Sequence, residues 1–286
     1  MAKIGKKEQK ALNEKLFEVL SFPEASSEEV LELLNKGADP TSTVEAFEDE
    51  SAICLATEIQ PAEIVKLLLD NCNYDVNQGV DDESGPDAPI YCAAENPDIR
   101  VFSMLINEYN ADCPLYGDFN PITKICFKYW ERLESGDSNN PFESTEDLYC
   151  YLSEACHIDD QNIFWNAVLG NCLDLCKYMK QEKEISLDME RDDGESAIHL
   201  ASKCSIDAEV LKWLVEDESI SPETDSSTGM RPIHFASQGM FPAVEAIDYL
   251  VKCCKVDTNV QSGEGLYPIH YICRDSYVEW ASLSRS

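Results

Sequence analysis

A five-residue pattern recurs along the whole chain: two adjacent apolar residues, one other residue, and two more apolar residues. In such a segment the four apolar positions fall on one side of a helix, because one helical turn takes about 3.6 residues. The recurrence therefore predicts a series of amphipathic helices with polar or turn-forming residues between them. The paired positions lie at 30–34, 64–68, 101–105, 148–152, 175–179, 210–214 and 246–250.

A short phrase built around isoleucine precedes these segments at a nearly fixed interval. Ser196–Ala201 is echoed by Arg231–Ala236 and again by Tyr267–Ile272. Including weaker matches upstream, the isoleucines stand at 53, 90, 122, 163, 198, 233 and 269, in steps of 37, 32, 41, 35, 35 and 36 residues. A period in this range is typical of stacked repeats rather than of one globular core.

The residues around these segments also favour helices. In the phrase, a first Ser or Thr suits an N-cap, a following Pro suits the first turn, and the Ile is expected to point into the stack. Near the start of the chain, Ala11–Leu20 is predicted as a first helix. Ser26 and Ser27 are predicted to cap a second helix that ends at Gly37.

The phrase resembles the Thr-Pro-Leu-His signature of ankyrin repeats. The segments Gly37–Asp39, Tyr74–Asn77 and Asn110–Asp112 are similar to the Gly-Ala-Asp-Val-Asn ending of that family. The resemblance covers the chain from about residue 10 to its end. It implies an all-α ankyrin-repeat solenoid of about seven helix-pair repeats plus a partial eighth.

The expected organisation is a basic tail at residues 1–10 followed by one array over residues 11–286. A polar insertion near 133–146 is predicted to lie on the surface. The last repeat looks incomplete, since Tyr277–Ser286 lacks the five-residue pattern of apolar pairs that marks a second helix. Because arrays need a polar terminal cap, either this tail is an imperfect cap or the natural protein continues beyond residue 286.

The net charge of the chain disfavours some classes of binding partner. Asp and Glu number 55 against 22 Lys and Arg, for a net charge of −33. Nucleic acids and anionic membranes bind through cationic contacts, so both are disfavoured and a basic protein is expected. No signal peptide or long apolar stretch is apparent. The 13 cysteines form no dense framework, which favours reduced thiols and a cytoplasmic or nuclear location. The chain by itself is expected to be a monomer.

The histidines are predicted to be structural. His199, His234 and His270 share one repeat position, and the resemblance implies hydrogen bonds from that position to neighbouring backbone. Ligands of one zinc ion lie about 2 Å from the metal, so residues on successive repeats cannot converge on it.

The fourth histidine, His157, leaves an alternative open. It has four cysteines near it in sequence, which could form a zinc site or a thiol-dependent active site: Cys150, Cys156, Cys172 and Cys176. No tight Cys-x-x-Cys pair is present, and neither a phosphate-binding loop nor a nucleophile elbow appears. We therefore expect no catalysis, no metal and no cofactor.

The family resemblance places partner contacts on a concave face, formed by the first helices and the hairpin tips. The predicted tips are rich in acidic residues, and Tyr116 is a candidate aromatic anchor. The acidic contact residues predicted here are Glu48, Asp49, Glu50, Asp81, Asp82, Glu83, Asp188, Glu190, Asp192, Asp193 and Glu195.

The sequence thus predicts a non-catalytic scaffold whose acidic face binds a basic protein. The first alternative is a targeting or regulatory ankyrin module of a larger protein, including a bacterial effector. The second is the zinc- or thiol-dependent enzyme centred on residues 150–176.

Overall fold

The structure of the chain is a computed structural model, and its described residues form helices joined by turns and loops. Within them, β-pairing is limited to isolated bridges at Thr43–Ser51 and Glu190–Ser196. None of the described helices is long and apolar enough to cross a membrane. The described residues are 5–23, 25–43, 51–78, 88–115, 120–136, 140–191, 194–204, 207–238 and 243–273.

Two compact units divide the chain. The N-terminal unit consists of Met1–Lys128, Ser135–Glu143 and Glu154–His157. The C-terminal unit consists of Tyr129–Glu134, Ser144–Ser153 and Ile158–Ser286. The boundary passes through helix α7 (Pro121–Ser135).

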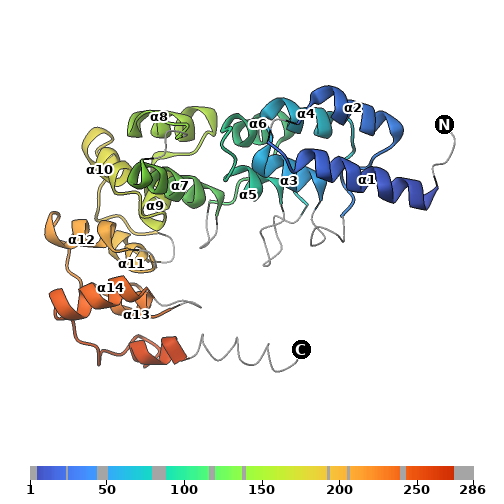
Figure 1. Cartoon of the computed structure of the whole chain (residues 1–286). Coiled ribbons are helices and arrows are strands. Elements are labelled where there is room, and N and C mark those ends of the chain that lie inside the picture. Colours follow the sequence, from blue (N-terminus) through green and yellow to red (C-terminus); the bar gives the residue numbers. More distant parts are fainter. Residues whose placement is uncertain are drawn as a thin grey trace. The chain divides into compact units, whose positions relative to one another are not determined.

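Helices of the N-terminal unit stack in two layers (Figure 1). Its helices are α1 (Lys6–Leu20), α2 (Ser27–Lys36), α3 (Ala52–Ile59), α4 (Ala62–Asp70), α5 (Pro89–Ala93) and α6 (Arg100–Tyr109). Helices α1, α3 and α5 contact one another in sequence, and so do α2, α4 and α6. Each helix of the first layer also contacts the next helix along the chain, so the unit is built from consecutive helix pairs.

The C-terminal unit repeats this arrangement. Its helices are α8 (Thr145–Cys150), α9 (Asp160–Leu169), α10 (Leu173–Glu182), α11 (Ala197–Ala201), α12 (Glu209–Glu216), α13 (Pro232–Ala236) and α14 (Val244–Asp248), with π-helical turns at η2 (Tyr151–Ala155) and η3 (Tyr249–Cys253). Helices α9, α11 and α13 form one layer, and α8, α10 and α12 form the other. Residues 268–273 are also helical.

The repeated isoleucines lie in the core, as the sequence predicts, with one exception. Those at 53, 90, 122, 163, 198 and 233 are at most 3% exposed. Ile269 is 57% exposed, because no described helix pair follows it to cover its side chain. The expectation that every isoleucine of the phrase is buried in the stack is therefore wrong at the last repeat.

Helix ends agree with the sequence in part. Gly37 ends α2 in the left-handed region with φ +99°, and Ser51 caps α3 by accepting a hydrogen bond from the Cys54 amide. Ser26 occupies the N-cap position of α2, as predicted, although its side chain makes no capping hydrogen bond. Helix α1 begins at Lys6 rather than at residue 11, which makes part of the basic opening helical.

The polar insertion near 133–146 is only partly a surface loop. Helix α7 continues through Glu134 and Ser135, and Phe142 is 6% exposed. One apolar residue thus anchors a segment whose composition indicates full exposure to solvent.

Buried amides join neighbouring helix pairs in the N-terminal unit. The fully buried Gln60 donates from Nε2 to the carbonyl oxygens of Leu20 and Phe22, both at 2.7 Å. Its Oε1 accepts from the Ala25 amide at 3.1 Å. Asn96 donates in the same way to the carbonyls of Thr57 and Gln60, at 2.8 and 2.9 Å. These side chains satisfy backbone groups at the ends of the first-layer helices, where intrahelical partners run out.

Candidate protein-binding surface

Three turns of the same geometry precede the first-layer helices of the C-terminal unit. We call them the tip turns; they close between Arg191 and Glu195, Ser226 and Met230, and Ser262 and Leu266, where the first amide donates to the last carbonyl at 2.8–2.9 Å. The fourth residue of each is a glycine, and its amide donates to the first carbonyl. These glycines have φ of +76°, +67° and +76°, a region that strains other residues.

Backbone hydrogen bonds connect each tip turn to the next. The amide of Ser227 donates to the Gly194 carbonyl at 3.4 Å, and the amide of Gly263 donates to the Thr228 carbonyl at 3.0 Å. A Cβ on Gly194 would lie 2.3 Å from the Ser227 Cβ, and a Cβ on Gly229 would lie 2.9 Å from the Gly263 nitrogen. Glycine is therefore needed at these two positions both for its backbone angles and for the close approach.

Two buried histidines make hydrogen bonds to the backbone beside the tip turns. The Nδ1 atoms of His199 and His234 accept from the amides of residues 196 and 231, at 3.1 and 2.9 Å. Their Nε2 atoms reach the carbonyls of Thr224 and Val260 in the following repeat, at 3.0 and 3.2 Å. The predicted structural role of these two histidines is confirmed. The Nδ1 atom of His270 likewise accepts from the Tyr267 amide, at 3.0 Å, but the His270 side chain is exposed.

Burial favours the neutral form of His199 and His234 and outweighs the opposite effect of these backbone bonds. Burial is the main cause that lowers the pKa of both side chains below the ordinary value for histidine. Because Nδ1 accepts from a backbone N–H, the neutral ring carries its proton on Nε2, which donates to the carbonyl. Protonation of Nδ1 would remove the acceptor of that backbone N–H.

Acidic side chains flank the first two tip turns in register. Asp188 and Glu190 are exposed, and among the described residues neither makes a salt bridge. Glu223 and Asp225 occupy the equivalent places 35 residues later and are also exposed. We call these four residues the acidic row. Arg231 balances part of its charge, with Nε 3.0 Å from Asp225 and a terminal nitrogen 3.7 Å from Glu223.

Glu195 differs from the acidic row. Its carboxylate lies 3.1 Å from Lys203 Nζ and 3.9 Å from Arg191, and its side chain is only 17% exposed. Its charge is thus balanced within the unit, so it contributes less to an acidic surface than its sequence neighbours do.

Comparison with known families bears directly on this unit. Residues 164–262 match the family model for ankyrin repeats, in three copies. This part of the chain is made of ankyrin repeats. The match includes two of the tip turns together with the start of the third, and it includes both buried histidines. A search of curated proteins finds no match to the chain.

The match confirms the family suggested by the sequence. Ankyrin repeats generally mediate protein–protein interactions and are typically non-enzymatic. The three matched copies support repeats within residues 164–262, and the full count of about seven plus a partial eighth stays a prediction.

Most of the predicted contact residues lie outside the described residues. Of the predicted set, the described members are Asp188, Glu190 and Glu195. The others lie outside the described residues: Glu48, Asp49, Glu50, Asp81, Asp82, Glu83, Tyr116, Asp192 and Asp193. Glu223 and Asp225 were not among the predicted residues, although applying the 35-residue period to Asp188 and Glu190 leads directly to them.

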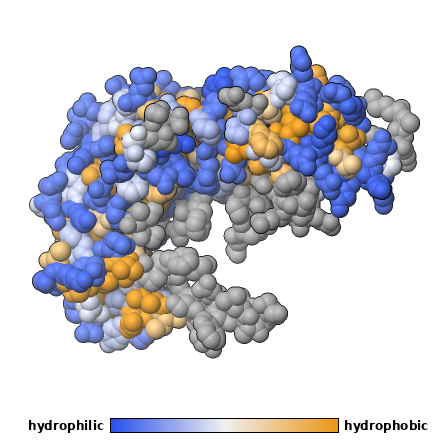
Figure 2. All heavy atoms as spheres, viewed as in Figure 1, coloured by the Kyte–Doolittle hydropathy of each residue, from blue (hydrophilic) through white to orange (hydrophobic). Residues whose placement is uncertain are grey.

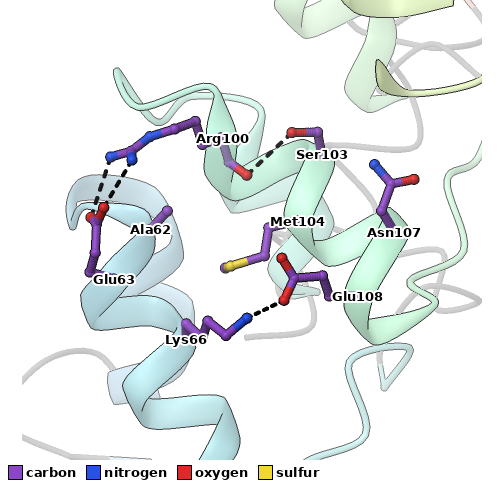
Figure 3. Close-up of a pocket in the computed structure, with 8 residues that line it drawn as sticks. All are labelled: Ala62, Glu63, Lys66, Arg100, Ser103, Met104, Asn107 and Glu108. Carbon is purple, nitrogen blue, oxygen red and sulfur yellow. Dashed lines mark hydrogen bonds and ion pairs between the residues drawn. The ribbon is translucent and has the colours of Figure 1, made fainter. Parts of the chain in front are cut away.

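A groove between α4 and α6 is a second surface feature, within the N-terminal unit (Figure 3). Arg100 bridges to Glu63 through two bonds of 2.9 and 3.3 Å, and Lys66 pairs with Glu108. Met104 lies between these two ion pairs, as Figure 3 shows. The four charged side chains that line the groove pair with one another, and Arg100 is shared with Asp98, so this groove offers no unpaired cation to an acidic partner.

Three of the four cysteines near His157 are buried. Cys172 is the N-cap residue of α10, Cys176 is fully buried in that helix, and Cys156 is 3% exposed. Burial raises the pKa of the Cys172 thiol to about 12, which disfavours the thiolate that metal binding or nucleophilic attack requires. Within the described part of the chain, no group of three or more His, Cys, Asp or Glu side chains could hold a metal ion.

Proposed function

We propose that the chain is a non-catalytic protein-binding scaffold whose acidic row binds a basic segment of another protein. The observation that carries the proposal is the register of the four carboxylates that precede two adjacent tip turns. The net charge of −33 has the sign that attracts such a partner. In the face seen in Figure 2, hydrophilic residues predominate and hydrophobic residues appear in small patches, which favours a polar contact.

The tip turns support this role because their backbone is fixed before a partner arrives. Hydrogen bonds between turns, glycines at positive φ and the two buried histidines all restrict the backbone beneath the acidic row. A surface that is already ordered loses less conformational entropy on binding. The charges would mainly speed encounter and set specificity. The predicted acidic residues outside the described ranges belong to the same proposal as further contacts on other tips.

Charge reversal tests the proposal. The variant Asp188→Lys/Glu190→Lys is compared with Asp217→Lys/Glu245→Lys, which makes the same change of net charge at two exposed positions, the C-cap of α12 and the first turn of α14. The probe is a short alternating Arg–Lys peptide, with affinity measured by fluorescence anisotropy at low and at physiological salt.

We expect the tip variant to weaken binding by roughly tenfold or more and to reduce its salt dependence, since two close contacts are lost. The control variant should lose far less. Equal losses in the two variants would show that the peptide responds to net charge alone, and that result would overturn the assignment of the acidic row.

A further inference from the structure

A pair of tyrosine rings on the C-terminal unit holds a cation. Tyr149 of α8 and Tyr178 of α10 have ring centroids 5.5 Å apart, with planes tilted by 44°. The ammonium nitrogen of Lys183 lies 3.9 Å from the centroid of the Tyr149 ring and 5.8 Å from that of Tyr178. Both distances are within the range in which the ring quadrupole attracts a cation. One ammonium group is therefore shared by two aromatic faces.

Backbone geometry places Lys183 over the rings. Lys183 is the C-cap residue of α10, and its amide donates to the Met179 carbonyl at 3.2 Å. Glu184 follows with φ +55°, and the amide of Ile185 donates to the same carbonyl at 3.2 Å. This left-handed ending turns the chain back toward the helix. The lysine is thus presented by the helix end rather than by a chance rotamer of an extended loop.

The rings themselves are fixed and lie among acidic groups. The Tyr149 hydroxyl donates to Asp160 Oδ1 at 2.9 Å, which holds that ring in place. Asp160 interacts electrostatically with Lys183, and Glu146 interacts with Tyr178. Neither tyrosine is fully buried. The pair therefore presents two partly accessible aromatic faces in a negative environment, which is the chemistry that suits an organic cation.

We propose that Tyr149 and Tyr178 form a receptor for a lysine or arginine side chain of a protein partner, and that Lys183 occupies it when no partner is bound. The inference rests on the proposed function only in that the partner is basic. The occupant is argued from the ammonium already seated on the rings and from the surrounding carboxylates. Lys183 acts as an intramolecular competitor, so removing it raises the affinity for an external cation.

The first test uses a small cation and does not depend on any protein partner. Tetramethylammonium chloride is titrated against the full chain, with ring-proton shifts of the tyrosines followed by NMR. Lys183→Gln should bind the cation roughly fivefold more tightly than the natural chain, as expected when an exposed cation–π contact is removed from competition. Adding Tyr178→Leu should abolish the gain, whereas Tyr178→Phe should retain it because the aromatic face remains.

Unchanged cation binding in Lys183→Gln would overturn the inference, and so would a gain that survives Tyr178→Leu. Lys183→Ala serves as a second variant in case the glutamine side chain itself packs on the rings. The alternating Arg–Lys peptide then separates this inference from the proposed function. A peptide gain in Lys183→Gln, together with no specific loss in Asp188→Lys/Glu190→Lys, supports the receptor while the acidic row fails, and the reverse pattern supports the acidic row alone.

Discussion

The two units differ in the side chains at the histidine position of the phrase. In the N-terminal unit the histidine position of the phrase holds Cys54, Tyr91 and Thr123, and buried amides such as Gln60 and Asn96 bond to backbone at the far end of the first-layer helices. In the C-terminal unit His199 and His234 bond at the beginning of those helices, directly beneath the tip turns. The core isoleucines are equally buried in both units.

The two kinds of contact have different consequences: one stabilises the stack of helices, and the other also fixes the turns that form the candidate binding surface. An amide at the end of a helix stabilises the stack but does not touch the turn that precedes the helix. A histidine bonded to the next repeat fixes that turn, and the glycine contacts then align successive turns. Among the described residues, equivalent carboxylates stand in register before the first two tip turns of the C-terminal unit.

The largest effect is expected from Gln60→Leu in the N-terminal unit. The change leaves three backbone groups without their partner, and each buried unsatisfied group costs about 1–3 kcal/mol, so we expect a loss of about 4 kcal/mol. Urea unfolding followed by circular dichroism measures the loss. Gln78→Leu, at an exposed position, is the matched control and should change stability by less than about 0.5 kcal/mol. Similar losses in both variants would contradict the role given to the buried amide.

The next effect tests the contact between tip turns. Gly229→Ala introduces a positive-φ alanine and a close contact with the Gly263 backbone, and we expect it to cost about 3 kcal/mol. Gly265→Ala has a similar φ but no atom within 4 Å of the new Cβ, so it should cost only about 1–2 kcal/mol. Urea midpoints of the C-terminal unit compare them. Equal losses would mean that the turns do not need their close approach.

A smaller loss is expected from His234→Ala. It removes a buried side chain with two backbone bonds, and the cost should be about 2 kcal/mol. His270→Ala removes one bond from an exposed side chain and should cost no more than about 1 kcal/mol. Thermal unfolding of the two variants measures the difference. A larger loss at residue 270 would contradict the link between repeats that we assign to Nε2.

The smallest effect is a dependence on pH. His199 and His234 have lowered pKa values when folded, whereas histidine in an unfolded chain titrates near 6.5. Below about pH 6.5 the unfolded chain binds protons that the folded chain does not, so their contribution to stability is complete above that pH and is lost as pH falls. Between pH 7.5 and 5.5 each histidine should therefore lose part of its contribution to stability.

The variant His199→Gln/His234→Gln isolates this term from the titration of carboxylates. This variant should be less stable than the natural chain by a smaller free energy of unfolding at pH 5.5 than at pH 7.5. A constant difference at the two pH values would contradict the neutral, buried state of these histidines.

Periodicity was sufficient to predict the architecture. The paired apolar positions and the isoleucine phrase predict helix pairs because helical burial repeats every 3.6 residues and each repeat buries the same face. The structural role of His199 and His234 followed from their shared position. Ile269 was predicted wrongly because a repeat pattern gives the position of a side chain but not whether another repeat covers it.

The surface was less predictable for a physical reason. Gln60 reads as an ordinary polar residue, since its burial depends on carbonyls about 40 residues away. Glu195 reads as another tip acid, and only the fold shows it beside Lys203. The cation between Tyr149 and Tyr178 depends on a left-handed residue after a helix, which the sequence at Glu184 does not signal.

The acidic row is tested most directly by locating a bound basic peptide. The full chain, labelled with ¹⁵N, is titrated with the alternating Arg–Lys peptide at physiological salt, and amide shifts are followed by NMR. The account predicts that shifts concentrate at Asp188, Glu190, Glu223 and Asp225 and fade as salt is raised. Shifts centred instead on the control positions Asp217 and Glu245, with the acidic row unchanged, would contradict it.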